Sequence, residues 1–223
     1  DQKHHQTLYD KGIEEPVVQL QCSEDGQNII GLVTQRYLND WEVEVISPKG
    51  QKVQIKQRGE YAVDSATVYS QGEKLNYYSG SKDIMFRISN MSKGKWTMQI
   101  QIQNQTTNRV DLWISGKQSN PYVTLFPQNP YVTIGSVGNI GAVTCVAGYN
   151  LDELTTLRNS GRGYTMDNRV KPTLAADGII QTIDTNGEAV VVEGVEVSAS
   201  VILGAAATIF EKWRAESGSP LLN

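Results

Sequence analysis

Short segments in which apolar and polar residues alternate follow one another from residue 15 to about residue 117. A period of two places one face of each segment in a core and the other face in water. Turn residues such as Ser47-Pro48-Lys49-Gly50 separate the segments, and no helical period lies between them. Clear examples are residues 17–22, 41–46, 52–55, 83–88, 96–102 and 109–114. This pattern predicts an antiparallel β-sandwich, and within that class a jelly roll.

The pattern changes after Pro121. Residues 141–147 form a nearly continuous apolar run, which is typical of a strand buried on both faces of an α/β sheet. Residues 197–213 show a helical period, and the small residues at 204–207 predict a helix that packs tightly inside a protein. Two or three strands and one buried helix are too few to close an α/β domain. We therefore expect this half of the chain to need further polypeptide to complete its fold.

Charge and hydropathy exclude two classes of partner. The 223 residues carry 20 Lys and Arg against 24 Asp and Glu, a net charge of −4. This balance gives no electrostatic reason to expect nucleic acid or an anionic membrane surface as a partner. The longest apolar run, residues 197–210, contains Ser198 and Ser200. It is shorter than the roughly 20 residues of a membrane span. The first five residues are polar or charged and do not read as a signal peptide.

Cysteine and histidine give little sign of a metal site or a cofactor. Cys22 and Cys145 each lie in an apolar, strand-like setting, so a disulfide and two buried free thiols both stay open, with the thiols favoured. His4 and His5 have no Cys or carboxylate neighbour at ligand spacing, and we expect no metal there. Asp184 and Glu188 flank an Asn-Gly turn, where a calcium site is a minor alternative. We expect no cofactor.

Residues 142–210 carry three motifs in an order that resembles a known family. Residues 143–150, Val-Thr-Cys-Val-Ala-Gly-Tyr-Asn, are similar to an I-T-V-G-A strand. Residues 159–178 follow the pattern S-x-R-G-x-T-x-D-x-R-x-K-P-D-x-x-A-P-G. Residues 194–207 are similar to G-T-S-M-A-S-P-x-x-A-G-A-A-A. Together they resemble the last third of the catalytic domain of the subtilisin-like serine peptidases, the subtilases.

The third motif departs from the family at the nucleophile. The family's nucleophilic serine falls on Glu196, and the threonine before it falls on Val195, after Gly194. Ser198 and Ser200 fall on the small-residue and proline positions, so neither inherits the nucleophile's role. The resemblance therefore implies that no catalytic residue is intact. For Glu196 we favour a helix-capping role over a salt bridge to a partner, and both over acid–base or metal chemistry.

The first half of the chain has its own resemblance. It is similar to the β-sandwich inserted into the germination-type subtilases of spore-forming clostridia. The resemblance implies that residues 1–14 end a preceding subtilase segment, residues 15–118 form the inserted jelly roll, and residues 119–223 form the C-terminal part of the catalytic domain. The phrase Asn-Pro-Tyr-Val-Thr occurs at 120–124 and again at 129–133, where the chain would return to the protease fold.

Other residues have a structural and a functional interpretation. Ser160, Gly161 and Arg162 are candidates for a substrate cleft. Arg162 and Asp167 together could form part of a substrate cleft, but a structural ion pair between them that holds the loop is favoured. Three tryptophans could form a carbohydrate platform, but each lies in an alternating strand, which favours core filling. They are Trp41, Trp96 and Trp113.

The leading hypothesis is a catalytically inactive subtilase homologue, a pseudoprotease that acts by binding or regulation, with a role in spore germination implied by the resemblance. Its partner would be a peptide or protein, such as another subtilase or a missing N-terminal half, and its location extracellular or spore-associated. Two alternatives stay open: the C-terminal part of an active serine endopeptidase, and a β-sandwich module that binds a glycan or a protein. The sequence leaves substrate, oligomeric state and the role of the sandwich open.

Overall fold

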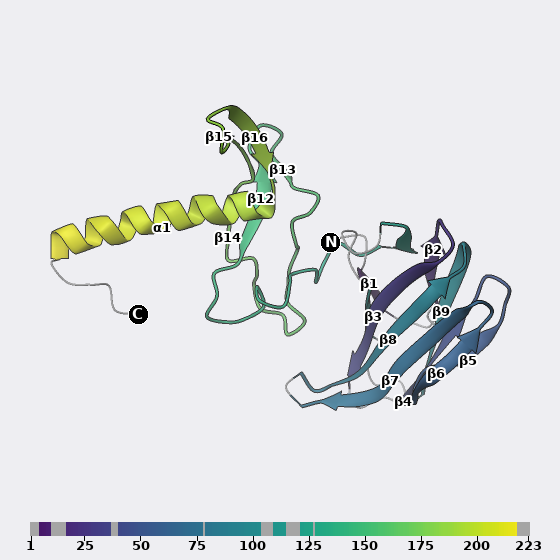
Figure 1. Cartoon of the computed structure of the whole chain (residues 1–223). Helices are drawn as coiled ribbons and strands as arrows, with labels where there is room; N and C mark the ends of the chain where they lie inside the picture. Colours follow the sequence, from purple (N-terminus) through teal and green to yellow (C-terminus); the bar gives the residue numbers. More distant parts are fainter. Residues whose placement is uncertain are drawn as a thin grey trace. The chain divides into compact units, whose positions relative to one another are not determined.

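The chain folds into two compact units, one ending at Pro130 and the other beginning at Tyr131 (Figure 1). The structure, a computed structural model, describes residues 5–9, 17–36, 40–77, 79–103, 109–114, 121–126 and 128–217. The first unit is an antiparallel β-sandwich, and the second combines short strands with one long helix. This combination confirms the predicted fold class, a mixed α+β chain that begins with an antiparallel sandwich.

The described strands of the first unit form two sheets whose pairings are all antiparallel. One sheet has the order β1 (His5–Tyr9), β10 (Arg109–Ile114), β3 (Gln27–Arg36), β8 (Ser81–Met91), β7 (Ala66–Asn76) and β6 (Arg58–Val63). The other has the order β11 (Val123–Phe126), β2 (Val17–Cys22), β9 (Gly94–Gln103), β4 (Asp40–Ile46) and β5 (Lys52–Gln54). We interpret the orders β1-β10-β3-β8 and β2-β9-β4-β5 as those of a jelly roll, with the other strands as additions.

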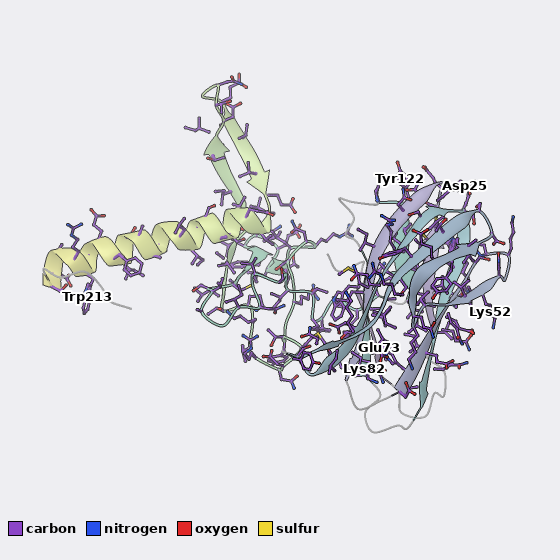
Figure 2. All side chains as sticks on the ribbon, turned by 60° about the horizontal axis from the view of Figure 1, so that its bottom comes forward. Asp25, Lys52, Glu73, Lys82, Tyr122 and Trp213 are labelled. Carbon is purple, nitrogen blue, oxygen red and sulfur yellow. The ribbon has the colours of Figure 1, made fainter. Side chains whose placement is uncertain are left out.

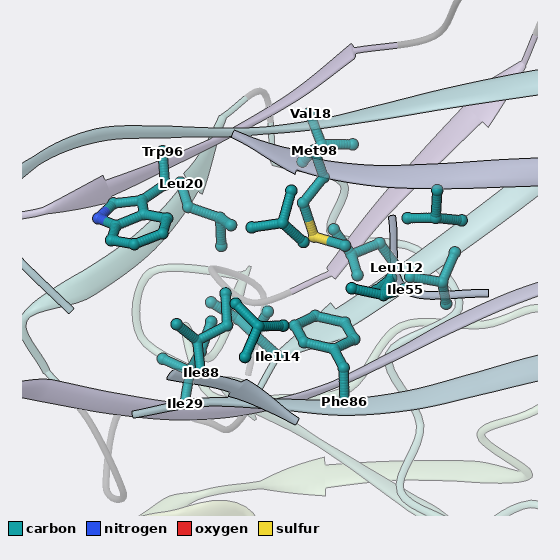
Figure 3. Close-up of a cluster of buried hydrophobic side chains, with 14 of the residues drawn as sticks. Val18, Leu20, Ile29, Ile55, Phe86, Ile88, Trp96, Met98, Leu112 and Ile114 are labelled. Carbon is teal, nitrogen blue, oxygen red and sulfur yellow. The ribbon is translucent and has the colours of Figure 1, made fainter. Parts of the chain in front are cut away.

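Side chains from both sheets fill the space between them (Figure 3). Trp96 and Met98 come from one sheet, and Ile88 and Phe86 come from the other. These alternating inward residues are the ones that the period of two predicted.

Two tryptophans of the sandwich have core positions. Trp41 and Trp96 are both 0% exposed. The indole N–H of Trp41 donates to Glu73 Oε2 at 2.6 Å, and that of Trp96 donates to the Ser92 carbonyl at 2.9 Å. Buried indoles with satisfied N–H groups are structural. Core filling is therefore confirmed for these two, while Trp113 on β10 is half-buried.

The expected end of the sandwich at residue 118 differs from the division that the structure makes. Strand β11 pairs with β2 from Val123↔Cys22 to Phe126↔Gln19. These residues therefore belong with the sandwich here, and the second unit starts at Tyr131.

The second unit is a thin assembly around one parallel strand pair. Strand β12 (Val146–Asn150) pairs in parallel with β14 (Leu174–Asp177) and antiparallel with the short β13 (Thr155–Thr156). Strands β15 (Ile179–Ile183) and β16 (Ala189–Glu193) form a hairpin, and helix α1 (Val195–Ser217) follows. Among the described residues of this unit, Leu157 and Ala176 are the buried apolar side chains.

The helix and the first strand predicted for the second unit are present, but both are less buried than predicted. Helix α1 was expected to be buried, yet Ser198 is its one buried residue. The strand expected at residues 141–147 begins only at Val146, and most residues of β12 are half-buried. Both differences follow from the same fact: among the described residues, two or three short strands and one helix cannot cover each other on more than one side. No described helix is long and apolar enough to cross a membrane.

Both cysteines are free thiols. Cys22 is buried in the sandwich and its Sγ lies 3.0 Å from the Glu24 carbonyl, while Cys145 is half-buried in the second unit. Burial raises the pKa of both thiols above the ordinary value. Because the thiolate is the reactive form, both should react slowly at neutral pH.

We therefore expect a thiol-specific reagent such as dithionitrobenzoate to label the native, unreduced chain slowly and the denatured, unreduced chain quickly at two positions. Absorbance at completion gives the number of thiols, and a peptide map gives their identity. A denatured chain without reactive thiols would instead mean that Cys22 and Cys145 form a disulfide.

Candidate functional site

The segment that resembles the nucleophile turn leads into α1. Gly194 is buried, and its N–H donates to the Gly178 carbonyl at 2.9 Å. Glu196 lies exposed in the first turn of the helix, where a carboxylate is favoured by the helix dipole by about 0.3–1 kcal/mol. A Cβ atom at position 194 would lie 2.7 Å from Glu196 Oε2, so glycine leaves room for this carboxylate. This location suits the helix-capping role predicted for Glu196.

The two serines that follow are not placed as nucleophiles. Ser198 is 0% exposed and packs against the backbone of β12 and of the turn after β14. A Cβ atom on Gly148 or on Gly178 would lie 3.1 Å or 2.8 Å from Ser198 Oγ. The hydroxyl of Ser200 donates to the Glu196 carbonyl at 2.9 Å, one helical turn earlier. The sequence has two histidines, His4 and His5, whose side chains lie outside the described part of the chain.

The predicted cleft residues Ser160, Gly161 and Arg162 run beside the segment that starts at Tyr131. The Thr133 N–H donates to the Arg162 carbonyl at 3.0 Å, and the Arg162 N–H donates to Thr133 Oγ1 at 2.9 Å. A Cβ atom on Gly161 would lie 2.9 Å from the Thr133 carbonyl oxygen. The second Asn-Pro-Tyr-Val-Thr phrase thus supplies the neighbour of this loop, which sequence reasoning did not assign.

Ser160 has a structural contact. It is 1% exposed, and its Oγ accepts a hydrogen bond from the Gly148 N–H at 3.1 Å. The Ser160 N–H donates to the Leu157 carbonyl at 3.1 Å. The bond from Gly148 holds the loop on strand β12 and gives this serine a structural role. Its substrate-cleft role stays a prediction.

The predicted ion pair between Arg162 and Asp167 is wrong. Asp167 pairs with Arg169, whose Nε lies 2.7 Å from Asp167 Oδ2. Thr165 organises the turn between them: its hydroxyl donates to Asp167 Oδ1 and accepts from the Arg169 N–H at 2.9 Å. The tight turn brings position 169 beside position 167, whereas Arg162 lies against Thr133. Among the described residues, Arg162 Nε is buried without a hydrogen-bond partner.

The Arg169 guanidinium, followed by the Thr165 hydroxyl, lowers the pKa of the Asp167 carboxyl. A carboxyl whose folded pKa is lowered stabilises the fold above its unfolded value of about 3.9, and this contribution is lost as pH falls through the folded value. Because the pair is largely exposed, the effect on stability is small. We expect an NMR titration midpoint for Asp167 below the ordinary value, and Arg169→Gln should raise it.

Asp184 is the matched control for that titration. Hydrogen bonds from the backbone of Glu188 and Asn186 lower its pKa, so Arg169→Gln should leave its midpoint unchanged. An unchanged Asp167 midpoint in the variant would contradict the pairing.

Asp184 also decides how the predicted turn is built. Its Oδ1 accepts from the Asn186 N–H at 2.8 Å and from the Glu188 N–H at 2.9 Å, which closes the β15–β16 hairpin as predicted. The carboxylate is thus engaged by the turn itself. Within the described ranges, no three His, Cys, Asp or Glu side chains are grouped to hold a metal ion.

Comparison with known proteins gives a structural likeness. No family model and no curated protein sequence matches this chain. The solved structure of the Clostridium perfringens CspB protease is similar, with a TM-score of 0.83 and 23% sequence identity over 97% of this chain and 47% of that one. This chain therefore spans about half the length of that protein. The likeness supports the subtilase-like fold that the three motifs predicted.

Proposed function

We propose that this chain is the C-terminal part of a subtilase-like scaffold that acts by binding or regulation and does not hydrolyse peptide bonds. The observation that carries the proposal is Glu196 in the first turn of α1, at the place where the subtilase motif has its nucleophilic serine. The fold likeness to the CspB protease supports the scaffold, and Glu196 supports the loss of chemistry.

The chemistry of a serine peptidase explains why this one position matters. A serine hydroxyl attacks the peptide carbonyl, a histidine takes its proton, and an aspartate orients that histidine. Glu196 would form a mixed anhydride at best, and its charge would oppose a developing oxyanion. Loss of one triad member typically costs about four to six orders of magnitude in turnover. Ser198 is buried and Ser200 donates to a helix carbonyl, so neither provides a substitute nucleophile.

The proposed biological setting rests on resemblance to the germination-type subtilases of spore-forming clostridia. We place the protein beside active proteases of that group, outside the cell or associated with the spore. Its proposed partner is a peptide or protein, either another subtilase or the polypeptide that completes the scaffold.

The test is peptide hydrolysis by the purified full-length protein, with a mixture of peptide substrates and mass-spectrometric detection. We expect no turnover that phenylmethylsulfonyl fluoride abolishes. Inhibitor-sensitive turnover by the unaltered protein would overturn the proposal.

A double variant separates the pseudoprotease from the C-terminal part of an active endopeptidase whose nucleophile was altered. Val195→Thr/Glu196→Ser restores the family's residues, and Val195→Thr/Glu196→Ala is the matched control without a hydroxyl at position 196. We expect neither to hydrolyse peptides. Inhibitor-sensitive turnover by the serine variant alone would favour the endopeptidase alternative.

A further inference from the structure

The β15–β16 hairpin has an unpaired edge along β16. Among the described residues, β16 pairs with β15 alone, from Ile179↔Glu193 to Ile183↔Ala189. Figure 1 shows the hairpin projecting beside the start of α1, and Figure 2 shows it standing clear of the other described segments over most of its length. An unpaired edge presents a row of backbone N–H and C=O groups that can pair with another strand.

The hydrogen bonds of the hairpin decide which backbone groups face that edge. The Gly194 N–H donates to the Gly178 carbonyl at 2.9 Å, and the Asp184 N–H donates to the Glu188 carbonyl at 2.9 Å. In an antiparallel ladder, bonded pairs alternate with non-bonded pairs. The members of non-bonded pairs on β16 are Ala189, Val191 and Glu193. Their N–H and C=O groups therefore point away from β15, and no hydrogen bond between described residues engages them.

The side chains along this edge favour pairing with another strand. Residues 190–192 are three valines in a row, and β-branched side chains are the ones best suited to strands. Val191 is 69% exposed, and Ile183 on the same face of the hairpin is 71% exposed. Proteins usually protect an exposed edge with charged side chains, but here Glu188 and Glu193 flank the valines and none lies between them. An edge of this kind is a site of association.

We propose that β16 pairs with β16 of a second copy of this protein, antiparallel and centred on Val191. This register pairs all five residues of the strand with the same five residues of the second copy. Val191 then lies opposite Val191, Ala189 opposite Glu193, and Val190 opposite Val192. The three edge-facing residues of each copy form the hydrogen-bonded pairs, which exchange both N–H···O bonds. The two hairpins join in one sheet with twofold symmetry, the commonest symmetry of homodimers.

Charge and register favour a second copy as the occupant of this edge. In the proposed register each Glu193 lies beside an Ala189, whereas a pair centred on Glu193 would place two glutamates opposite each other and destabilise the sheet. The edge of β15 is less suited, because the outward-facing Ile179 N–H donates to Asp177 Oδ1 at 3.1 Å and α1 contacts this strand. The inference concerns association, so it does not depend on whether the protein hydrolyses peptides.

The first test is disulfide trapping in the full-length protein. Val191→Cys places two cysteines directly opposite each other in the proposed pair, with Cα atoms about 5.5 Å apart, within the range that a disulfide spans. Gln181→Cys is the matched control, because Gln181 lies opposite Val191 within the hairpin but on the other edge. The native thiols, Cys22 and Cys145, are common to both variants. After oxidation with diamide, we expect peptide mapping to find a covalent dimer linked at position 191 and none linked at position 181.

The second test measures mass by sedimentation equilibrium as the protein concentration rises. Val191→Lys places two like charges opposite each other at the centre of the proposed pair, and Gln181→Lys adds the same charge on the other edge. We expect the unaltered protein and the Gln181 variant to approach twice the monomer mass. The Val191 variant should need at least about tenfold higher concentration to do so.

Three results would overturn the inference. One is no linkage at position 191, or linkage as efficient at position 181. Another is an unaltered protein that stays monomeric up to its solubility limit. The third is a folded Val191→Lys variant that associates as the unaltered protein does. Should lysine unfold the hairpin, the cysteine variants decide, because their smaller, uncharged change leaves the ladder to β15 in place. Both readouts are independent of hydrolysis, so failure of the pseudoprotease proposal remains distinguishable.

Discussion

Replacing Phe86 with alanine is expected to lower the free energy of unfolding of the β-sandwich by about 3–5 kcal/mol. Phe86 is 1% exposed on β8 and pairs directly with Gly31 on β3. A Cβ atom on Gly31 would lie 2.2 Å from Phe86 Cζ, so the ring lies over the glycine backbone. Removal of the ring would leave a cavity between the sheets and uncover that backbone, and such cavities cannot collapse fully.

Met85→Ala is the matched control for this prediction. Met85 is next along β8 on the outer face and is 43% exposed, so its truncation should change stability by only about 0.5 kcal/mol. Urea unfolding followed by tryptophan fluorescence measures both, because Trp41 and Trp96 report on the core. The double variant Gly31→Ala/Phe86→Ala should cost less than the sum of the single variants, because the methyl group can enter the space that the ring leaves. Equal costs for the Phe86 and Met85 variants would contradict the predicted role of the ring.

The sandwich could be predicted from sequence because each of its sheets has one face in the core and the other face toward solvent. Alternation along residues 41–46 and 96–102 fixes which side chains face the core, and Trp41 and Trp96 follow that rule. Alternation of apolar and polar residues does not show which strands pair when they lie far apart in sequence, such as β10 with β3. Pattern therefore predicts the class of fold, while strand order comes from the structure.

The second unit was harder to predict because its helix burial and ion pairing depend on tertiary contacts, which the spacing of residues in the sequence does not reveal. Small residues at 204–207 indicated a buried helix, but a thin helix shows only that a neighbour can approach closely. The preference of Asp167 for Arg169 over Arg162 depends on the turn at Thr165, which brings position 169 back toward position 167. The motif resemblance, in contrast, correctly brought residues 143–150, 159–178 and 194–207 into one unit.

The close approach of α1 to the strands was also missed, although the sequence carried its signal. Gly148 lies within strand β12 and Gly178 directly follows strand β14, and Ser198 is the small residue that meets both. Glycine at these places removes side chains that would hold the helix away from β12 and β14. The resemblance places Ser198 at the family's small-residue position, but the sequence does not assign it these two packing partners.

The second large effect follows from this contact: Gly178→Ala should destabilise the packing of α1 by about 1–3 kcal/mol. The added Cβ would lie 2.4 Å from Leu157 Cδ1, 2.8 Å from Ser198 Oγ and 2.9 Å from the Gly194 carbonyl oxygen. The Leu157 side chain can rotate away, but the Gly194 carbonyl belongs to the backbone at the start of the helix. The helix must therefore shift, and amide hydrogen exchange in its first turns should become faster.

Gly204→Ala tests the same chemical change at a position on α1 where a Cβ atom meets nothing within 4 Å. There alanine should stabilise the helix by up to about 1 kcal/mol, because glycine loses more backbone entropy on folding. The two substitutions should thus move exchange in α1 in opposite directions. Adding Ser198→Gly to Gly178→Ala should recover part of the loss, since it removes one of the close contacts, but the Gly194 carbonyl would still prevent full recovery. Slower exchange in the Gly178 variant would mean that α1 does not pack on this glycine, and the contact with Ser198 would then need another explanation.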